Sequence, residues 1–255
     1  MNEDVLTRQP PTYDLRLNYG ADENQFGHLR LPKSKAPFPL LMMLHGGYWR
    51  KKYDLLHAGH LCAALSKIGI ATFNLEYRRV GNPGGGWPGT FEDVSNGLRF
   101  IQQHAAEHGI NPQRSLVMGH SAGGQLALCL AHRVPTLTGV ISLAGVLDLQ
   151  RGYQLHLSND AVSEFLGGAP QQVPEHYHEA SPSEISIPKV PQKIIHGDAD
   201  EVVPVEMARD YVRKKKQSGE RVELIEPRGA GHFDLIDPQS KFFAFVQHSV
   251  EKLLA

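Results

Sequence analysis

Short apolar runs alternate along the chain with longer stretches of helical periodicity. Pro39–His45 is apolar up to its last residue, and Ile70–Glu76 is a second such run. Strands that are buried on both faces have this composition. Between the two runs, Asp54–Lys67 has the period of a helix and ends just before Gly69, a residue type that commonly terminates helices. This alternation predicts parallel strands joined by helices.

The same alternation continues through most of the sequence. Tyr13–Tyr19 and Gly27–Leu31 indicate two early strands, which we expect to form an antiparallel edge. The other expected strands are 115–119, 138–143, 192–196 and 221–225. The other expected helices are 91–108, 122–133, 204–217 and 238–254. We therefore predict a single α/β domain over residues 1–255, with a mostly parallel central sheet of about eight strands and helices on both faces.

One segment departs from this pattern. Residues 146–190 lack strong periodicity, apart from a short helix expected near Asn159–Leu166. The segment follows the sixth expected strand. We predict that it is a small cap-like insertion over one end of the sheet.

The strongest chemical signal is the pentapeptide Gly119-His120-Ser121-Ala122-Gly123, which has the pattern G-x-S-x-G. A strand is expected before it and a helix after it, so Ser121 would stand on a sharp strand-to-helix turn. Glycine on either side removes the Cβ atoms that would clash in such a turn. The start of the helix directs unpaired N–H groups toward the serine. Ser121 is therefore our candidate nucleophile.

A serine hydroxyl attacks poorly unless a base removes its proton. His232 lies in a glycine-rich loop, Gly229–Phe233, after the strand expected at 221–225. It is our candidate base, since the base comes last in chain order when G-x-S-x-G supplies the nucleophile. Pairs of histidines with spacings that could bind a metal occur at His57 and His60, at His104 and His108, and at His176 and His178. No third ligand is evident near any pair, so we predict no metal site.

Two aspartates are candidates for the acid that orients the base. The segment His196-Gly197-Asp198-Ala199-Asp200 follows the penultimate expected strand. Position alone does not choose between Asp198 and Asp200. The other aspartate would bind loop N–H groups or cap the following helix.

Acyl transfer also needs hydrogen-bond donors for the oxyanion that develops in the transition state. The backbone N–H of Ala122, directly after the candidate nucleophile, is the first expected donor. The loop His45-Gly46-Gly47-Tyr48-Trp49, after the first buried strand, has the glycines needed to turn its N–H groups inward. We expect Gly47 and Tyr48 to be the further donors.

Together these motifs resemble the α/β-hydrolase superfamily, in particular its esterase and lipase branch with an HGG loop. The resemblance covers nearly the whole chain, from about Leu15 to Leu254. The family pattern His-Gly-x-x-Asp-x-x-Val-Pro is present at His196–Pro204, and by this resemblance Asp200 is the acid of the triad. The resemblance also implies an α/β-hydrolase fold and a mechanism without a cofactor.

Two subgroups of that branch are similar to this sequence. The segment His45–Trp49 looks like the HGGxW motif of kynurenine formamidases. The segments Leu29–Pro32, Glu76–Arg78 and Gly123-Gly124 are similar to small bacterial carboxylesterases, including feruloyl and acetyl-xylan types. Tyr48 departs from the lipase pattern because it replaces the third glycine of HGGG. A side chain at this position narrows the acyl side of the pocket and disfavours bulky acyl groups.

Composition and charge exclude other classes. The 26 Lys and Arg residues against 27 Asp and Glu residues give a net charge of −1, which provides no field for nucleic acid or an anionic membrane. The N-terminal segment lacks the apolar core of a signal peptide, and no run has the length of a membrane span. Cys62 and Cys129 lie in apolar helical patterns typical of buried free thiols. We expect a cytoplasmic protein.

The sequence thus predicts a serine carboxylesterase that cleaves small esters with short acyl groups through an acyl-enzyme. An arylformamidase acting on an N-formyl aryl amine is the first alternative, and a non-catalytic ligand receptor on the same scaffold is the second. Trp49 and Trp87 lie in loops expected near the catalytic end of the sheet and are candidates for the substrate pocket, with packing as their alternative role. The sequence does not indicate an oligomeric state.

Overall fold

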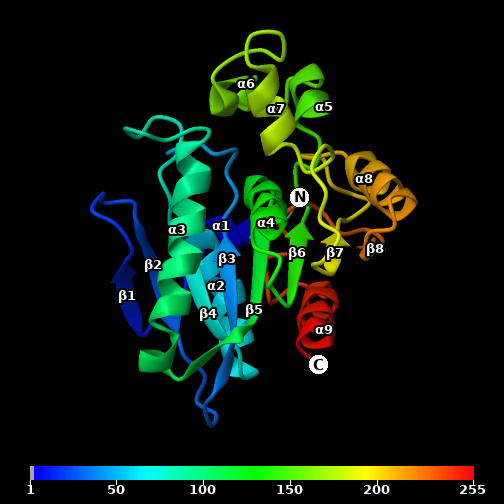
Figure 1. Cartoon of the computed structure of the whole chain (residues 1–255). Helices are drawn as coiled ribbons and strands as arrows, with labels where there is room; N and C mark the ends of the chain where they lie inside the picture. The colour runs from blue at the N-terminus through cyan, green and yellow to red at the C-terminus, as the bar shows by residue number, and fades with distance from the viewer. Residues whose placement is uncertain (1–2) are drawn as a thin grey trace.

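A single sheet runs through the computed structural model, which describes residues 3–255 (Figure 1). Within these residues it has eight strands in the order β1-β2-β4-β3-β5-β6-β7-β8. The strands are β1 (Leu15–Asn18), β2 (Phe26–Arg30), β3 (Phe38–Leu44), β4 (Ala71–Leu75), β5 (Ile110–His120), β6 (Gly139–Leu143), β7 (Gln192–Ile195) and β8 (Val222–Ile225). The pairs β1–β2 and β2–β4 are antiparallel, and all other neighbours are parallel. The predicted mostly parallel sheet with an antiparallel edge is confirmed.

Helices connect the strands at nearly the predicted positions. They are α1 (Asp4–Thr7), α2 (Gly59–Lys67), α3 (Gly89–Gln103), α4 (Ala122–Arg133), α5 (Leu149–Gln154), α6 (Ala161–Leu166), α7 (Pro174–Ala180), α8 (Val205–Gln217) and α9 (Phe243–Leu254), with 3₁₀ turns η1 (Leu55–Ala58) and η2 (Ala105–His108). The helix expected from residue 238 begins only at Phe243. The side chain of Asp237 accepts the N–H of Gln239 at 2.9 Å, and this local bond forms a turn in place of the first helical residues.

The residues of β3 explain why the sheet is covered on both faces. Leu40, Met42 and Leu44 pack in one core, and the intervening Leu41 and Met43 pack in the other. Side chains alternate between the faces of a strand, so an uninterrupted apolar run requires a cover on each side. Apolar residues of α3, α4 and α8 belong to the first core, and those of α2 and α9 belong to the second.

The strand β5 is longer than the sequence pattern indicated. It was expected to begin at residue 115 but begins at Ile110, which pairs with Phe38 of β3. A shift in register between Pro39 and Leu40 separates this first pairing from the regular ladder. The extra residues are partly polar and exposed, so their periodicity gave no strand signal.

The segment between β6 and β7 carries three short helices, α5, α6 and α7, where only α6 was expected (Figure 1). Figure 1 draws them together beyond the carboxyl end of the sheet. Helices of six or seven residues are too short to display a clear period, which explains why two of them were missed. Leu149, Phe165 and Tyr177 bury this segment against the first core. Its role as a cap remains a prediction.

Two further expectations concern burial and membrane association. Cys62 and Cys129 are both free and buried, as predicted. None of the helices within residues 3–255 combines the length and apolarity needed to cross a bilayer.

Candidate active site

Ser121 occupies the tight turn between β5 and α4. Its backbone angles, φ 55° and ψ −120°, lie in a region that residues with a side chain rarely adopt. The turn depends on its glycines: a Cβ at Gly119 would lie 1.9 Å from the carbonyl oxygen of Gly123, and one at Gly123 would lie 2.2 Å from that of Leu44. The predicted strand-to-helix turn is thus present, and it holds Ser121 at the amino-terminal end of α4.

A cavity of about 230 Å³ opens at Ser121. Its lining comes from loops that follow several strands and from the N-terminal segment, which brings together residues far apart in sequence. The lining residues are Glu3, Leu6, Gly47, Tyr48, Tyr53, His57, His120, Ser121, Ser158, Val202, His232 and Phe233. The candidate nucleophile and the candidate base therefore face the same cavity.

The loop after β7 brings an acid to the candidate base. Nδ1 of His232 lies 2.7 Å from Oδ2 of Asp200. The other oxygen of Asp200 accepts the N–H groups of Val202 at 2.8 Å and Val203 at 2.9 Å. Asp198 instead accepts the N–H of Gly229, at the start of the loop that carries His232. Of the two candidates, the structure places Asp200 against the base and Asp198 in the loop-binding role.

Asp200 has an unusual electrostatic environment. Burial alone would raise the pKa of its carboxyl group, but hydrogen bonds from His196 and His232 and from the N–H of Val203 outweigh burial and lower that pKa far below its ordinary value. Nε2 of His196 lies 3.2 Å from the same oxygen that faces His232. The carboxyl group of Asp200 is therefore ionised at neutral pH. An ionised acid can stabilise an imidazolium on His232.

The residues expected to bind the oxyanion come from two segments, the loop after β3 and the start of α4. Gly47 and Tyr48 line the cavity, with φ of 113° and 51°. Their backbone N–H groups donate to no acceptor within residues 3–255. Ala122 is the first residue of α4, so its N–H also lacks an acceptor inside the helix. The arrangement leaves three N–H groups near the serine available to a ligand.

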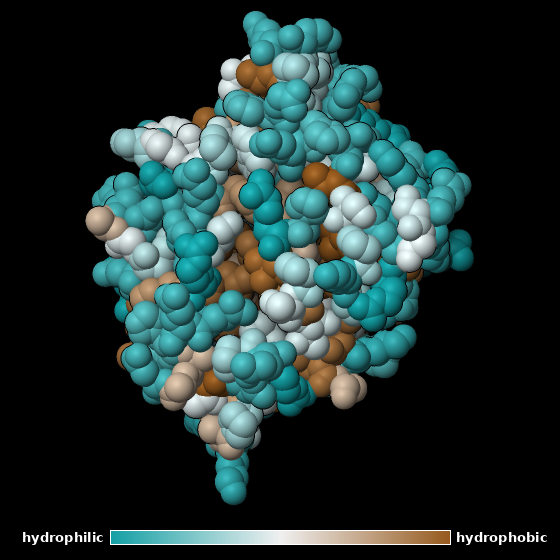
Figure 2. Space-filling view, in the orientation of Figure 1, coloured by the Kyte–Doolittle hydropathy of each residue, from teal (hydrophilic) through white to brown (hydrophobic). Residues whose placement is uncertain are grey.

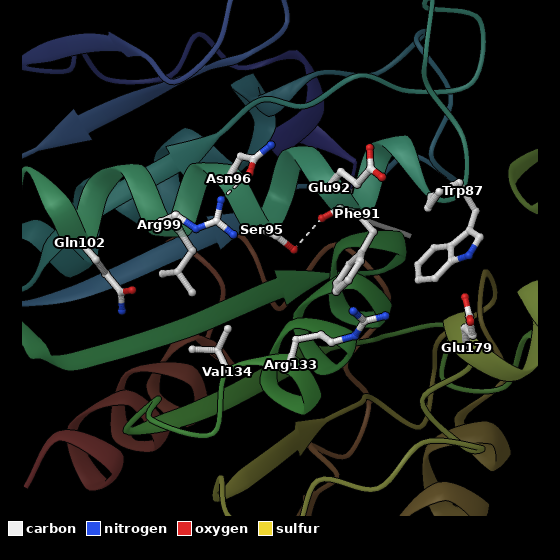
Figure 3. Close-up of a pocket in the computed structure, with 12 residues that line it drawn as sticks. Trp87, Phe91, Glu92, Ser95, Asn96, Arg99, Gln102, Arg133, Val134 and Glu179 are labelled. Atoms are coloured by element: carbon white, nitrogen blue, oxygen red, sulfur yellow. Dashed lines mark hydrogen bonds between the residues drawn. The ribbon is translucent and has the colours of Figure 1, made fainter.

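The two tryptophans lie elsewhere. Trp49 is 1% exposed, donates its Nε1–H to Oε1 of Gln125 at 3.0 Å and stacks on Phe165. Trp87 lines a separate groove between α3 and α4, where its ring stacks on Phe91 (Figure 3). In the orientation of Figure 1, the space-filling view of Figure 2 shows apolar surface near the centre of the molecule, surrounded by polar residues. Neither tryptophan lines the Ser121 cavity, and both have the packing contacts given as their alternative role.

Several lining residues were not singled out from the sequence. His57 was assigned only to a helix, yet it lines the cavity, and desolvation together with the nearby His45 and His232 lowers its pKa to about 3. His120 is fully buried, and burial followed by the proximity of His232 and His57 lowers its pKa well below the ordinary value. Glu3 and Leu6 come from the N-terminal segment around α1. His120 directly precedes Ser121 in the pentapeptide, whereas no local pattern marks the other three positions.

Within residues 3–255, the histidine pairs named from the sequence have no third metal-ligating side chain beside them. Across residues 3–255 no group of three or more His, Cys, Asp or Glu side chains is placed to hold a metal ion. His60, for example, uses its Nε2 to contact the carbonyl oxygen of Arg8 at 3.1 Å.

The fold and this site define the class of the protein. A mostly parallel eight-stranded sheet with a serine on the turn after β5 is the arrangement of an α/β-hydrolase of the esterase and lipase branch. The chain belongs to the BD-FAE family, whose model matches residues 29–214.

Curated relatives agree with this family. Esterase LipC of Mycobacterium tuberculosis is 27% identical over 87% of this chain, and a probable carboxylic ester hydrolase, LipM, of the same organism is 28% identical over 85%. The matched regions cover 60% and 54% of these two relatives, so the chain spans little more than half of their length.

Solved structures share the fold. A truncated carbohydrate esterase from gut microbiota superposes with a TM-score of 0.83 at 21% identity, covering 97% of this chain and 99% of that one. A thermophilic esterase of Thermogutta terrifontis superposes with a TM-score of 0.75 at 23% identity, covering 94% and 93%.

Proposed function

We propose that this protein is a serine hydrolase that cleaves small carboxylic esters through an acyl-enzyme. The observation that carries the proposal is the 2.7 Å contact between His232 and Asp200 at the wall of the cavity that also contains Ser121. A nucleophile, an ionised acid and a base, in this order along the chain, are the parts that acyl transfer requires. The names of LipC and LipM, which describe ester hydrolases, support the same reaction.

The residues would act in two half-reactions. In the first, Ser121 attacks the ester carbonyl while His232 takes the hydroxyl proton and passes it to the leaving alcohol. Asp200 orients the imidazole and stabilises its charge, and the N–H groups of Gly47, Tyr48 and Ala122 hold the oxyanion. In the second, water replaces the alcohol and releases the acid. No cofactor takes part in these steps.

The cavity supports a preference for short acyl groups. Its volume of about 230 Å³ is below the range of about 300–1,000 Å³ usual for ligand pockets. The side chain of Tyr48 lines it, and its hydroxyl donates to the carbonyl oxygen of Val202 at 3.1 Å, which ties the ring across the cavity. A long acyl chain would have to displace this ring.

Turnover of p-nitrophenyl esters from acetyl to dodecanoyl, measured beside N-formylkynurenine, tests the proposal. We expect the highest kcat/KM for acetyl and butyryl esters. Faster turnover of N-formylkynurenine than of any ester would replace the esterase with the arylformamidase alternative. Tight binding of these compounds without turnover would favour a ligand receptor and reject both enzymes.

A further inference from the structure

His45, the first residue of the HGG loop, has an oxygen atom against each ring nitrogen. Nδ1 lies 2.7 Å from the carbonyl oxygen of Gly46, and Nε2 lies 2.9 Å from Oε1 of Glu76. The ring is fully buried. A carbonyl oxygen only accepts hydrogen bonds, so Nδ1 must carry a proton. A second proton must then lie between Nε2 and the Glu76 carboxyl group.

The surroundings of Glu76 place that second proton on the histidine. Oε1 of Glu76 also accepts the N–H of Tyr77 at 3.0 Å and contacts Nη1 of Arg79 at 3.2 Å, and Oε2 accepts the N–H of Leu55 at 3.1 Å. Burial would raise the pKa of Glu76, but His45, Arg79 and the Tyr77 N–H outweigh it and lower that pKa. Glu76 is therefore a carboxylate that accepts from every neighbour, and both nitrogens of His45 are donors.

The peptide group that His45 contacts leads directly to the cavity. The carbonyl of Gly46 and the N–H of Gly47 belong to one amide; the His45 ring contacts its oxygen, and Gly47 lines the Ser121 cavity. A charged donor on a carbonyl oxygen polarises the amide and makes its N–H a stronger donor. Gly47 is one of the N–H groups assigned to the oxyanion.

We infer that His45 is an imidazolium held by Glu76 and that it strengthens the Gly47 N–H toward the oxyanion. His45 and Glu76 are then positioning and polarising residues that act through the Gly46–Gly47 amide. The inference rests on the proposed hydrolase function for its catalytic part, whereas the protonation state rests on the hydrogen bonds around His45 and Glu76 and does not depend on that function.

The groups around the His45 ring fit this charge. Glu76 and Arg79 are the charged side chains that face it, and the ring of Tyr77 stacks on it with centroids 4.3 Å apart. His57 meets it edge-on at 5.9 Å. Desolvation first, and the positive charge of His45 next, lower the pKa of His57 to about 3, so His57 remains neutral beside the imidazolium.

The sharpest variant is Glu76→Gln. Glutamine has the size of glutamate without its charge, and its amide can donate to Nε2 of a neutral His45 ring, although Tyr77 and Arg79 then lose the oxygen that accepts from them. Removal of an entire oxyanion donor costs about 10²–10³ in kcat, so weakening one donor should lower kcat by about tenfold with KM nearly unchanged. Unchanged kcat in a folded Glu76→Gln protein would overturn the inference.

Tyr77→Phe is the matched control. Its hydroxyl donates to the carbonyl oxygen of His45 at 2.7 Å, so the variant removes a buried hydrogen bond to the HGG loop while the stacked ring and the charge of Glu76 remain. We expect it to lower thermal stability while kcat falls by less than about twofold. Equal losses of kcat in both variants would indicate a structural effect and reject the polarising role.

Long-range ¹H–¹⁵N NMR of histidine-labelled wild-type protein reads the protonation state without substrate and without any variant. We expect one buried histidine with two protonated nitrogens at pH 7.5 that becomes a neutral ring in Glu76→Gln. A single neutral tautomer for His45 in the wild type would overturn the inference.

A failure of the hydrolase proposal can be distinguished from a failure of the inference about His45. If wild-type protein turns over no ester or amide, the NMR result still decides the protonation state. The rate at which a fluorophosphonate labels Ser121 then decides the polarising role, because its P=O oxygen needs the same donors. An equal labelling rate in wild type and Glu76→Gln would reject that role.

Discussion

Oδ2 of Asp200 lies 2.7 Å from Nδ1 of His232, with both side chains almost completely buried. The N–H groups of Val202 and Val203 hold the other carboxylate oxygen, so the acid has little freedom to rotate away from the imidazole. Asp198, only two residues earlier, is exposed and contacts Gly229. This difference between two neighbouring aspartates leads to the first prediction.

Asp200→Asn should be far more damaging to catalysis than Asp198→Asn. An amide at position 200 can favour the wrong tautomer of His232, and the loss of kcat can reach about 10⁴-fold. Asp198→Asn should retain most of its kcat, and because the amide oxygen can still accept the Gly229 N–H, its unfolding free energy should fall by no more than about 1 kcal/mol. Steady-state kinetics and chemical denaturation of both variants measure the difference; the opposite ranking of kcat would assign the acid role to Asp198.

Ser121→Ala should abolish covalent labelling by a fluorophosphonate. Alanine has the same backbone strain at φ 55° as serine, so the melting temperature should stay within about 2 °C of wild type. Mass spectrometry of the labelled protein and calorimetry check the two expectations. EDTA should leave the wild-type rate unchanged. Persistent labelling of the alanine variant, or a loss of activity in EDTA that zinc restores, would contradict the mechanism.

Tyr48→Gly should broaden the acyl preference. The residue has φ 51°, which glycine adopts without strain, and its removal frees space at the cavity wall. The ratio of kcat/KM for dodecanoyl to butyryl esters should rise about tenfold or more, the effect of roughly 1.4 kcal/mol in the transition state. Tyr48→Phe keeps the ring and loses only the hydroxyl bond to Val202, so the ratio should rise much less than in Tyr48→Gly. A ratio that stays constant in Tyr48→Gly would show that the ring does not limit the acyl group.

His57→Gln should make the protein less sensitive to mild acid. The pKa of His57 is lowered to about 3 in the folded state. Between about pH 6.5 and pH 3, the imidazole therefore binds a proton in the unfolded chain but not in the folded protein. The stabilisation from the neutral ring is complete above about pH 6.5. As the pH decreases below this value, the free energy of unfolding decreases by up to about 1.4 kcal/mol for each pH unit. Urea denaturation at pH 4.5, 5.5 and 7.5 should give a flatter dependence for His57→Gln.

The control for this pH effect is His248→Gln. His248 is exposed on α9, so its replacement should leave the pH dependence of wild type unchanged. Parallel stability curves for His57→Gln and wild type would mean that burial of His57 does not contribute to acid sensitivity.

The sequence located the parts of the site that depend on local structure. Ser121 was recognised because a strand, a helix and two glycines around it are all encoded within a few residues, and the structure has the turn that they predict. His232 followed from its position after the last strand. The alternation of apolar runs and helical periods likewise predicted the sheet, because burial on two faces forces apolar residues at consecutive positions.

Only the tertiary structure decided which distant residues meet at Ser121. No local sequence pattern marks His57 and Leu6, and they reach the cavity because η1 packs against β3 and α1 packs against η1. Trp49 was a candidate for the substrate pocket, yet it packs against Gln125 and Phe165 in the core. Sequence patterns indicate which side chains are buried, because buried positions repeat with the period of each helix or strand. They do not indicate which loops contact one another, because those contacts depend on the packing of the whole chain.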